Sequence, residues 1–135
     1  MTGRAGSKQL MRRAALLAVI LLTGFTAADR ADGAKHSVTV TFDYNFDMTP
    51  ACSEKVTENC VQQFNVYDIS AGVENRTRLF VIPVDPAAKG VVNGITGTSP
   101  LLLFSPGKHL IAVVAQTPSG RKSDMGACVT WIEIK

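Results

Sequence analysis

The stretch HSVTVTFDYNF, residues 36–46, sets the expectation for the whole fold. From Val38 to Phe46 every second residue is apolar or aromatic, and the residues between them are polar. A period of two with β-branched and aromatic side chains is typical of a strand that buries one face. Because Thr49 and Pro50 then break the pattern, a half-buried strand is expected over residues 36–46.

Five more segments have the composition of strands and are separated by turn signals. They are residues 61–69, 78–84, 101–104, 109–116 and 128–134. The segment 87–99 is rich in Gly and small residues, so a flexible surface connection is expected there. No stretch of the sequence has helical periodicity. The pattern predicts an all-β fold, an antiparallel β-sandwich of six to seven strands.

The first 28 residues have the layout of a secretory signal peptide. The segment begins with a part that contains no acidic residue and four bases, Arg4, Lys8, Arg12 and Arg13. Twelve almost wholly apolar residues, 14–25, follow, and small residues then precede Asp29. A membrane anchor is the alternative, but a spanning helix needs about 20 apolar residues. We therefore expect cleavage after Ala28 and a periplasmic or extracellular protein that is soluble after signal removal.

The remaining chain, residues 29–135, has the size and composition of one globular domain. The full sequence of 135 residues is 46% hydrophobic and 19% charged, which fits a single core. Lys and Arg number 14 against 11 Asp and Glu, and 4 of these bases lie in the signal segment. The exported domain therefore carries 10 bases against 11 acids. Without a basic stripe, no nucleic-acid partner is expected.

Three parts of the sequence resemble a fibronectin type III domain, an immunoglobulin-like β-sandwich. FSPGKHLIAVVA, residues 104–115, with the polar turn at 118–120, is similar to one corner, strand and turn of that family. VTVTF at 38–42 and FNVY at 64–67 are similar to two further strands. The resemblance covers about residues 36–135. It implies a binding or spacer module and names no ligand.

Three departures from the family pattern matter. Phe42 stands where the family usually has Trp, and His109 stands at the corner where it usually has Tyr. We expect His109 to form a hydrogen bond with nearby backbone. Only seven residues, 29–35, precede the first strand of the exported domain, which leaves the presence of a full N-terminal strand open.

The three cysteines permit three single bridges. The family-like arrangement places the strand at 109–116 between the strands at 61–69 and 128–134. Cys60 and Cys128 would then be two strand spacings apart, about 9–10 Å. A bridge needs Cα atoms within roughly 7 Å. The resemblance therefore favours a structural bridge between Cys52 and Cys60, with Cys128 free and packed.

The family-like alignment also predicts an exposed apolar face. It turns every second residue of 109–116 inward, beginning with His109. On the last strand, Trp131 alternates in step with Glu133 and Lys135, which need water, so Trp131 is expected to point outward with them. The predicted ligand-binding face consists of Tyr67, Leu110, Val114 and Trp131. Exposed apolar patches that contain Trp and Tyr are typical of partner sites. The alternatives are that segment 29–35 or 87–99 covers this face, or that the register is inverted.

Neither a metal site nor a catalytic site is expected. Asp43, Asn45, Asp47 and Glu54 match four positions of a calcium loop, but Met48 occupies its glycine position. The two histidines, His36 and His109, have no nucleophile elbow or paired-acid motif around them. No cofactor and no enzymatic activity are therefore predicted; a small hydrolase would need a polar pocket around His109.

The sequence thus predicts an exported, non-catalytic β-sandwich module that binds a protein or a glycan through a sheet face or loops. The alternative is a structural subunit or spacer. Such a chain would assemble through an open sheet edge, as a homo-oligomer or in a larger fibre.

Overall fold

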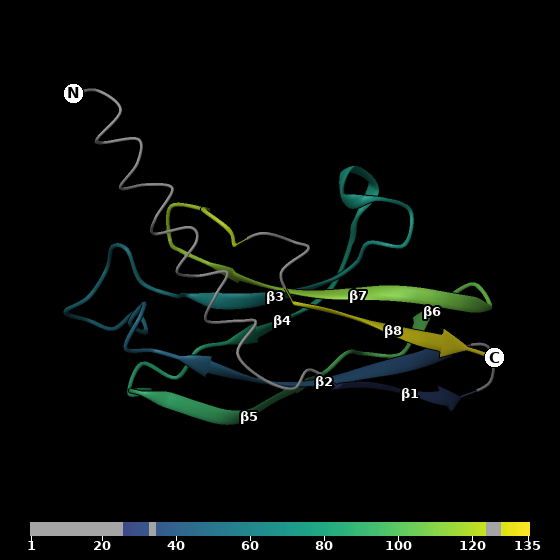
Figure 1. Cartoon of the computed structure of the whole chain (residues 1–135), viewed down its shortest axis with the longest axis horizontal. Helices are drawn as coiled ribbons and strands as arrows, with labels where there is room; N and C mark the ends of the chain where they lie inside the picture. The colour runs from purple at the N-terminus through teal and green to yellow at the C-terminus, as the bar shows by residue number, and fades with distance from the viewer. Residues whose placement is uncertain (1–25, 33–34, 124–127) are drawn as a thin grey trace.

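The computed structural model describes residues 26–32, 35–123 and 128–135, which form two antiparallel sheets packed face to face (Figure 1). The predicted all-β sandwich is confirmed. The strands are β1 (Thr26–Asp32), β2 (Lys35–Asn45), β3 (Gln63–Asp68), β4 (Thr77–Pro83), β5 (Val91–Thr98), β6 (Leu102–Leu103), β7 (Gly107–Gln116) and β8 (Val129–Ile134). A short 3-10 helix, η1 (Val73–Asn75), lies between β3 and β4.

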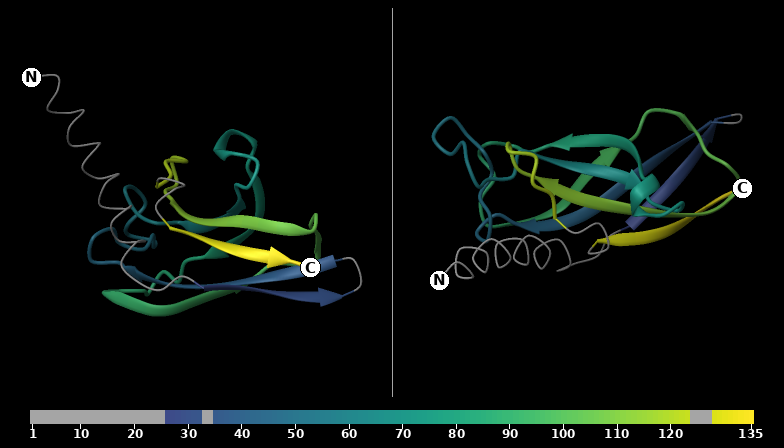
Figure 2. Two further views of the ribbon diagram at one scale, coloured as in Figure 1. Left: turned by 45° about the vertical axis from the view of Figure 1, so that its right-hand side comes forward. Right: turned by 90° about the horizontal axis from the view of Figure 1, so that it is seen from above.

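The two sheets have different strand orders. The first has the order β1-β2-β5, and the short β6 also pairs with β2, at its start. The second has the order β4-β3-β7-β8. Figure 2 shows the two layers from the side and from above. β7 lies between β3 and β8, so the arrangement expected for these three strands is confirmed.

The core lies between the sheets and is built around β2. The alternating residues from Val38 to Phe46 are at most 5% exposed, as the sequence predicts. Phe42 and Tyr44 meet Phe64 of β3 edge to face, with ring centroids 4.8 and 5.1 Å apart. Such contacts add to the free energy gained by burying these rings. The period-two pattern therefore anchors one sheet on the other.

The segment 87–99, predicted to be a flexible connection, contains β5, so that prediction is wrong. Glycine is depleted in strands, but both glycines of β5 have a specific place. Gly94 has a φ of 70° at an irregularity in the pairing, where the Asp43 carboxylate accepts its N–H at 2.7 Å. Gly97 lies so close to the second sheet that a Cβ would come within 2.5 Å of Ile82. These glycines permit a bulge and a close approach.

A strand, β1, precedes β2, but only part of it lies in the expected exported domain. β1 pairs antiparallel with β2 over seven residue pairs. Its residues 26–28 fall within the predicted signal peptide, and residues 1–25 of that segment lie outside the described part of the chain. Cleavage after Ala28 would leave residues 29–32 of β1 beside β2.

Candidate functional site

The predicted binding face lies on the outer side of the second sheet. Tyr67 is on β3, Leu110 and Val114 are on β7, and Trp131 is on β8. Leu110 is directly opposite Trp131, and Tyr67 is opposite Ala112. The residues that alternate with them along β7 belong to the core between the sheets. The predicted orientation of β7 is therefore confirmed.

Exposure divides this face into two parts. Trp131 is 62% exposed, whereas Tyr67 is 6% and Val114 0% exposed. Tyr67 and Val114 form a second buried cluster with Ile69 and Ala112. Strands β3 and β7 have a neighbouring strand on each side, while β8 is at the edge of its sheet. The prediction of a continuous exposed strip is therefore wrong at Tyr67 and Val114.

Trp131 borders a shallow hollow of about 390 Å³. Lys108, Ile132 and Glu133 also line it, and Lys108 is directly opposite Glu133 on the neighbouring strand. The half-buried Leu110 lies opposite Trp131. An aromatic ring flanked by an aliphatic side chain and by one charge of each sign can contact an apolar group and also form hydrogen bonds.

The outer edge of β8 presents unpaired backbone groups. The N–H of Val113 donates to the Cys128 carbonyl at 3.0 Å, which places Cys128 and every second residue after it in the ladder with β7. The N–H and C=O groups of Val129, Trp131 and Glu133 therefore point away from β7. Within the described part of the chain these groups have no hydrogen-bond partner. β1 of the first sheet lies beside this edge but forms no ladder with it, so another strand that pairs with β8 would have to lie next to β1.

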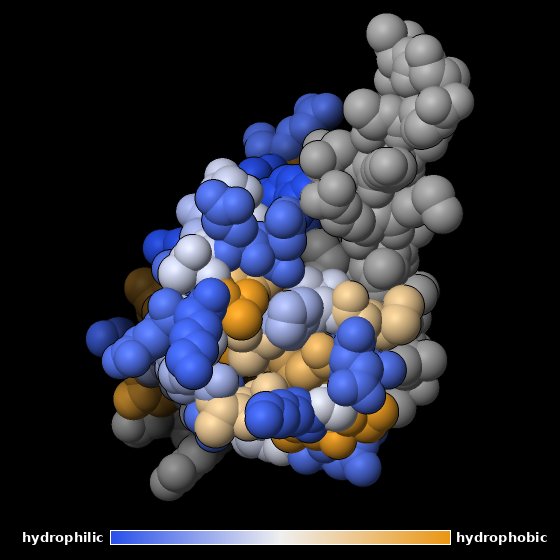
Figure 3. Space-filling model, turned by 90° about the vertical axis from the view of Figure 1, so that its left-hand side faces the viewer, coloured by the Kyte–Doolittle hydropathy of each residue, from blue (hydrophilic) through white to orange (hydrophobic). Residues whose placement is uncertain are grey.

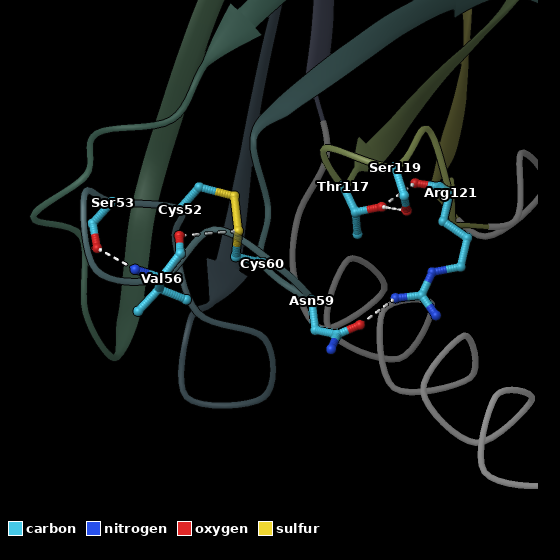
Figure 4. Close-up of a disulfide and its surroundings, with 8 residues drawn as sticks. All are labelled: Cys52, Ser53, Val56, Asn59, Cys60, Thr117, Ser119 and Arg121. Atoms are coloured by element: carbon cyan, nitrogen blue, oxygen red, sulfur yellow. Dashed lines mark hydrogen bonds between the residues drawn. A yellow bond between two sulfur atoms is a disulfide. The ribbon is translucent and has the colours of Figure 1, made fainter. Parts of the chain in front are cut away.

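The connection between β2 and β3 is closed by the predicted disulfide (Figure 4). Cys52 and Cys60 have Cα atoms 4.9 Å apart. Within the loop, the Ser53 hydroxyl accepts the N–H of Val56 at 3.2 Å. Cys128 is free and buried, which is also as predicted, and burial raises its pKa to about 12. Its thiol is therefore inert at neutral pH.

At the same end of the molecule, a cleft of about 580 Å³ lies between this loop and the turn after β7. Its lining residues are Thr57, Glu58, Asn59, Pro118, Ser119 and Arg121. The Arg121 guanidinium donates to the Asn59 side-chain oxygen at 3.1 Å (Figure 4). Figure 3 views this end and shows polar side chains around a smaller hydrophobic area. No pattern in the sequence indicates the cleft, because Asn59 and Arg121 are 62 positions apart.

The corner before β7 is held by His109, which is 7% exposed. Its Nε2 lies 2.7 Å from the Ser105 carbonyl oxygen, so the predicted bond to nearby backbone is confirmed. Its Nδ1 lies 2.7 Å from Asp68 Oδ2, a partner that the sequence did not indicate. Both nitrogens of the His109 ring therefore have a partner within the protein.

Asp68 links this corner to the end of β3. The Ser70 hydroxyl donates to Asp68 Oδ1 at 2.5 Å and accepts the N–H of Leu110 at 2.9 Å. Burial raises the pKa of the Asp68 carboxyl, but hydrogen bonds from Ser70 and His109 outweigh it and hold the pKa below its ordinary value. The Ser70 hydroxyl is bonded to Asp68, and both nitrogens of His109 have other partners, so these bonds hold the corner in place. Ser70 is not hydrogen-bonded to His109 in this arrangement, as a nucleophile would be to its general base.

Two residues of the calcium-loop pattern accept hydrogen bonds from backbone N–H groups. The Asp43 carboxylate accepts the N–H of Gly94, and the Asn45 side chain accepts the N–H of Asp47 at 2.9 Å. Among the described residues there is no group of three His, Cys, Asp or Glu side chains placed to hold a metal ion.

Comparison with family models, curated proteins and solved structures found no match. In the described part of the chain, no helix has the length and apolar character needed to cross a membrane.

Proposed function

We propose that this chain is an exported, non-catalytic module, similar to a fibronectin type III domain, that binds a protein or a glycan. The N-terminal layout of basic, apolar and small residues supports export. The disulfide between Cys52 and Cys60 is in keeping with it, since such bonds persist outside the cytoplasm. The position of β7 between β3 and β8 supports the family resemblance.

The observation that carries the proposal is the exposure of Trp131. A Trp side chain that is 62% exposed on a folded domain leaves a large apolar area in water. Trp is enriched among the residues that dominate binding energy, because it combines a broad apolar surface with a hydrogen-bond donor. The hollow beside it supplies Lys108 and Glu133 for polar contacts. A partner that covers Trp131 would gain from each of these features.

The test uses the exported product of the full chain, with its N-terminus determined by intact mass. This protein is screened on arrays of glycans and of extracellular proteins, and hits are quantified by biolayer interferometry. For protein hits, Trp131→Ala is expected to weaken binding by about tenfold or more. Leu103→Ala is the matched control, since Leu103 is 74% exposed on the other sheet. Protein hits that all bind Trp131→Ala as tightly as the wild type would contradict the role of Trp131.

A second candidate function, a structural subunit or spacer, is favoured by the unpaired edge of β8. Sedimentation velocity at increasing concentration would then detect self-association. Glu133→Pro removes an N–H that points outward and leaves the ladder with β7 intact, so it is expected to abolish assembly. Glu133→Gln retains that N–H and is the control. A monomer at every concentration would exclude assembly of this chain with itself.

A further inference from the structure

We infer that the cleft between the β2–β3 loop and the β7–β8 turn is a saccharide-binding site. The inference rests on the proposed function: it takes the case in which the partner is a glycan and names the site that binds it. The cleft volume of about 580 Å³ lies within the range of roughly 300–1,000 Å³ that small-molecule sites occupy. The site is separate from Trp131, which borders a different hollow.

The walls of the cleft are held in place before any ligand arrives. The disulfide between Cys52 and Cys60 constrains the loop that forms one wall. On the other wall, the hydroxyl groups of Thr117 and Ser119 form a hydrogen bond of 3.0 Å. The bond from Arg121 to Asn59 joins the two walls. A preorganised site loses less conformational entropy on binding, which raises its affinity for any ligand that fits it.

The lining groups match the hydrogen-bonding chemistry of sugars. Thr57 and Glu58 are exposed, and their side chains have no hydrogen bond or ion pair within the described part of the chain. The hydroxyl of Thr57 can donate and accept, and the carboxylate of Glu58 can accept from two neighbouring hydroxyls. Bonds to a charged carboxylate are stronger than bonds between neutral groups. Asn59 of the same loop and Arg121 of the facing wall also line the cleft.

The same lining argues against a protein or a polyanion as the occupant. The six described lining residues include no aromatic side chain and no large aliphatic one, and Arg121 is the single one among them of a type that is enriched in protein hot spots, which are Trp, Tyr and Arg. The charges of Glu58 and Arg121 balance, so the cleft does not select a highly charged ligand. A neutral, hydroxyl-rich oligosaccharide fits both facts.

The experiment places the exported protein on a glycan array that carries β-glucan, α-glucan, chitin and mannan oligosaccharides. The strongest hit is then measured as a soluble oligosaccharide by isothermal titration calorimetry. Glu58→Gln is expected to weaken binding about tenfold, because a charged acceptor becomes neutral. Thr57→Val is expected to weaken it as well. Glu54→Gln is the matched control, since Glu54 is an exposed carboxylate of the same loop that does not line the cleft.

Three results would bear differently on the inference. A loss with Glu58→Gln and Thr57→Val, with unchanged binding by Glu54→Gln, supports it. Saccharide binding that is lost only with Trp131→Ala would overturn it and leave the proposed function standing on the β8 face. If no oligosaccharide on the array binds, the cleft is not a saccharide site. The proposed function then depends on the protein array and Trp131→Ala alone.

Discussion

The two ends of the sandwich are closed by different chemistry. At one end a covalent bond between Cys52 and Cys60 restrains the loop beside the cleft. At the other end His109 restrains the corner through hydrogen bonds of 2.7 Å to Ser105 and to Asp68. Reductants would break the disulfide, whereas protonation of the Asp68 carboxylate would weaken the hydrogen bonds at the corner. The cleft is therefore kept rigid over a wide pH range, whereas the strength of the corner depends on pH.

The largest effect is expected from removal of the covalent closure. Cys52→Ala combined with Cys60→Ala should lower the free energy of unfolding by about 2–3 kcal/mol, because the unfolded chain regains the freedom of the closed loop. Urea unfolding measures this loss. Dithiothreitol should destabilise the wild type to a similar extent and leave the double variant unchanged. An equally stable double variant would mean that the hydrogen bonds of the loop suffice to hold it.

A smaller loss is expected at the corner. His109→Phe keeps the edge contact with Phe104, whose ring centroid lies 5.4 Å from that of His109, but removes both hydrogen bonds. The free energy of unfolding should fall by about 1–2 kcal/mol. Asp68→Asn and the double variant complete a thermodynamic cycle with His109→Phe. Additive losses would show that the two side chains stabilise the corner independently, contrary to the geometry.

The pH dependence should separate the two closures. The pKa of Asp68 is lowered in the folded state from the ordinary value of 3.8. A lowered folded pKa contributes stability above the unfolded value, and this stability is lost as the pH falls toward the folded one. Below about pH 4, the wild type should therefore lose stability more steeply than Asp68→Asn. Asp47→Asn, which removes an exposed carboxylate, is the matched control for the loss of one acid.

The comparison of the ends also shows what the sequence could predict. The alternation of residues 36–46 identified β2 because a period of two is a local property of the chain. The bridge between Cys52 and Cys60 followed from the family-like strand order, which excluded the pairing of Cys60 with Cys128. The first prediction depended on one segment alone, and the second on a resemblance that covers most of residues 36–135.

What the sequence could not predict depends on contacts between distant segments. β5 was missed because Gly94 and Gly97 weaken the strand pattern, and the close approach to Ile82 that requires Gly97 exists only in the folded chain. The link from His109 to Asp68 spans 41 positions. Burial of Tyr67 and Val114 depends on which strands flank β3 and β7. In each case the deciding neighbour is far away in the sequence.

The smallest effect on stability is expected at Trp131, which lies near neither closure. Because this side chain is 62% exposed on an edge strand, Trp131→Ala should change the free energy of unfolding by no more than about 0.5 kcal/mol. Circular dichroism is the suitable readout, since the variant lacks the single Trp of the chain. A loss as large as that of His109→Phe would make Trp131 part of the folded core. Trp131 would then serve the stability of the fold, and its proposed role in binding a partner would lose its main support.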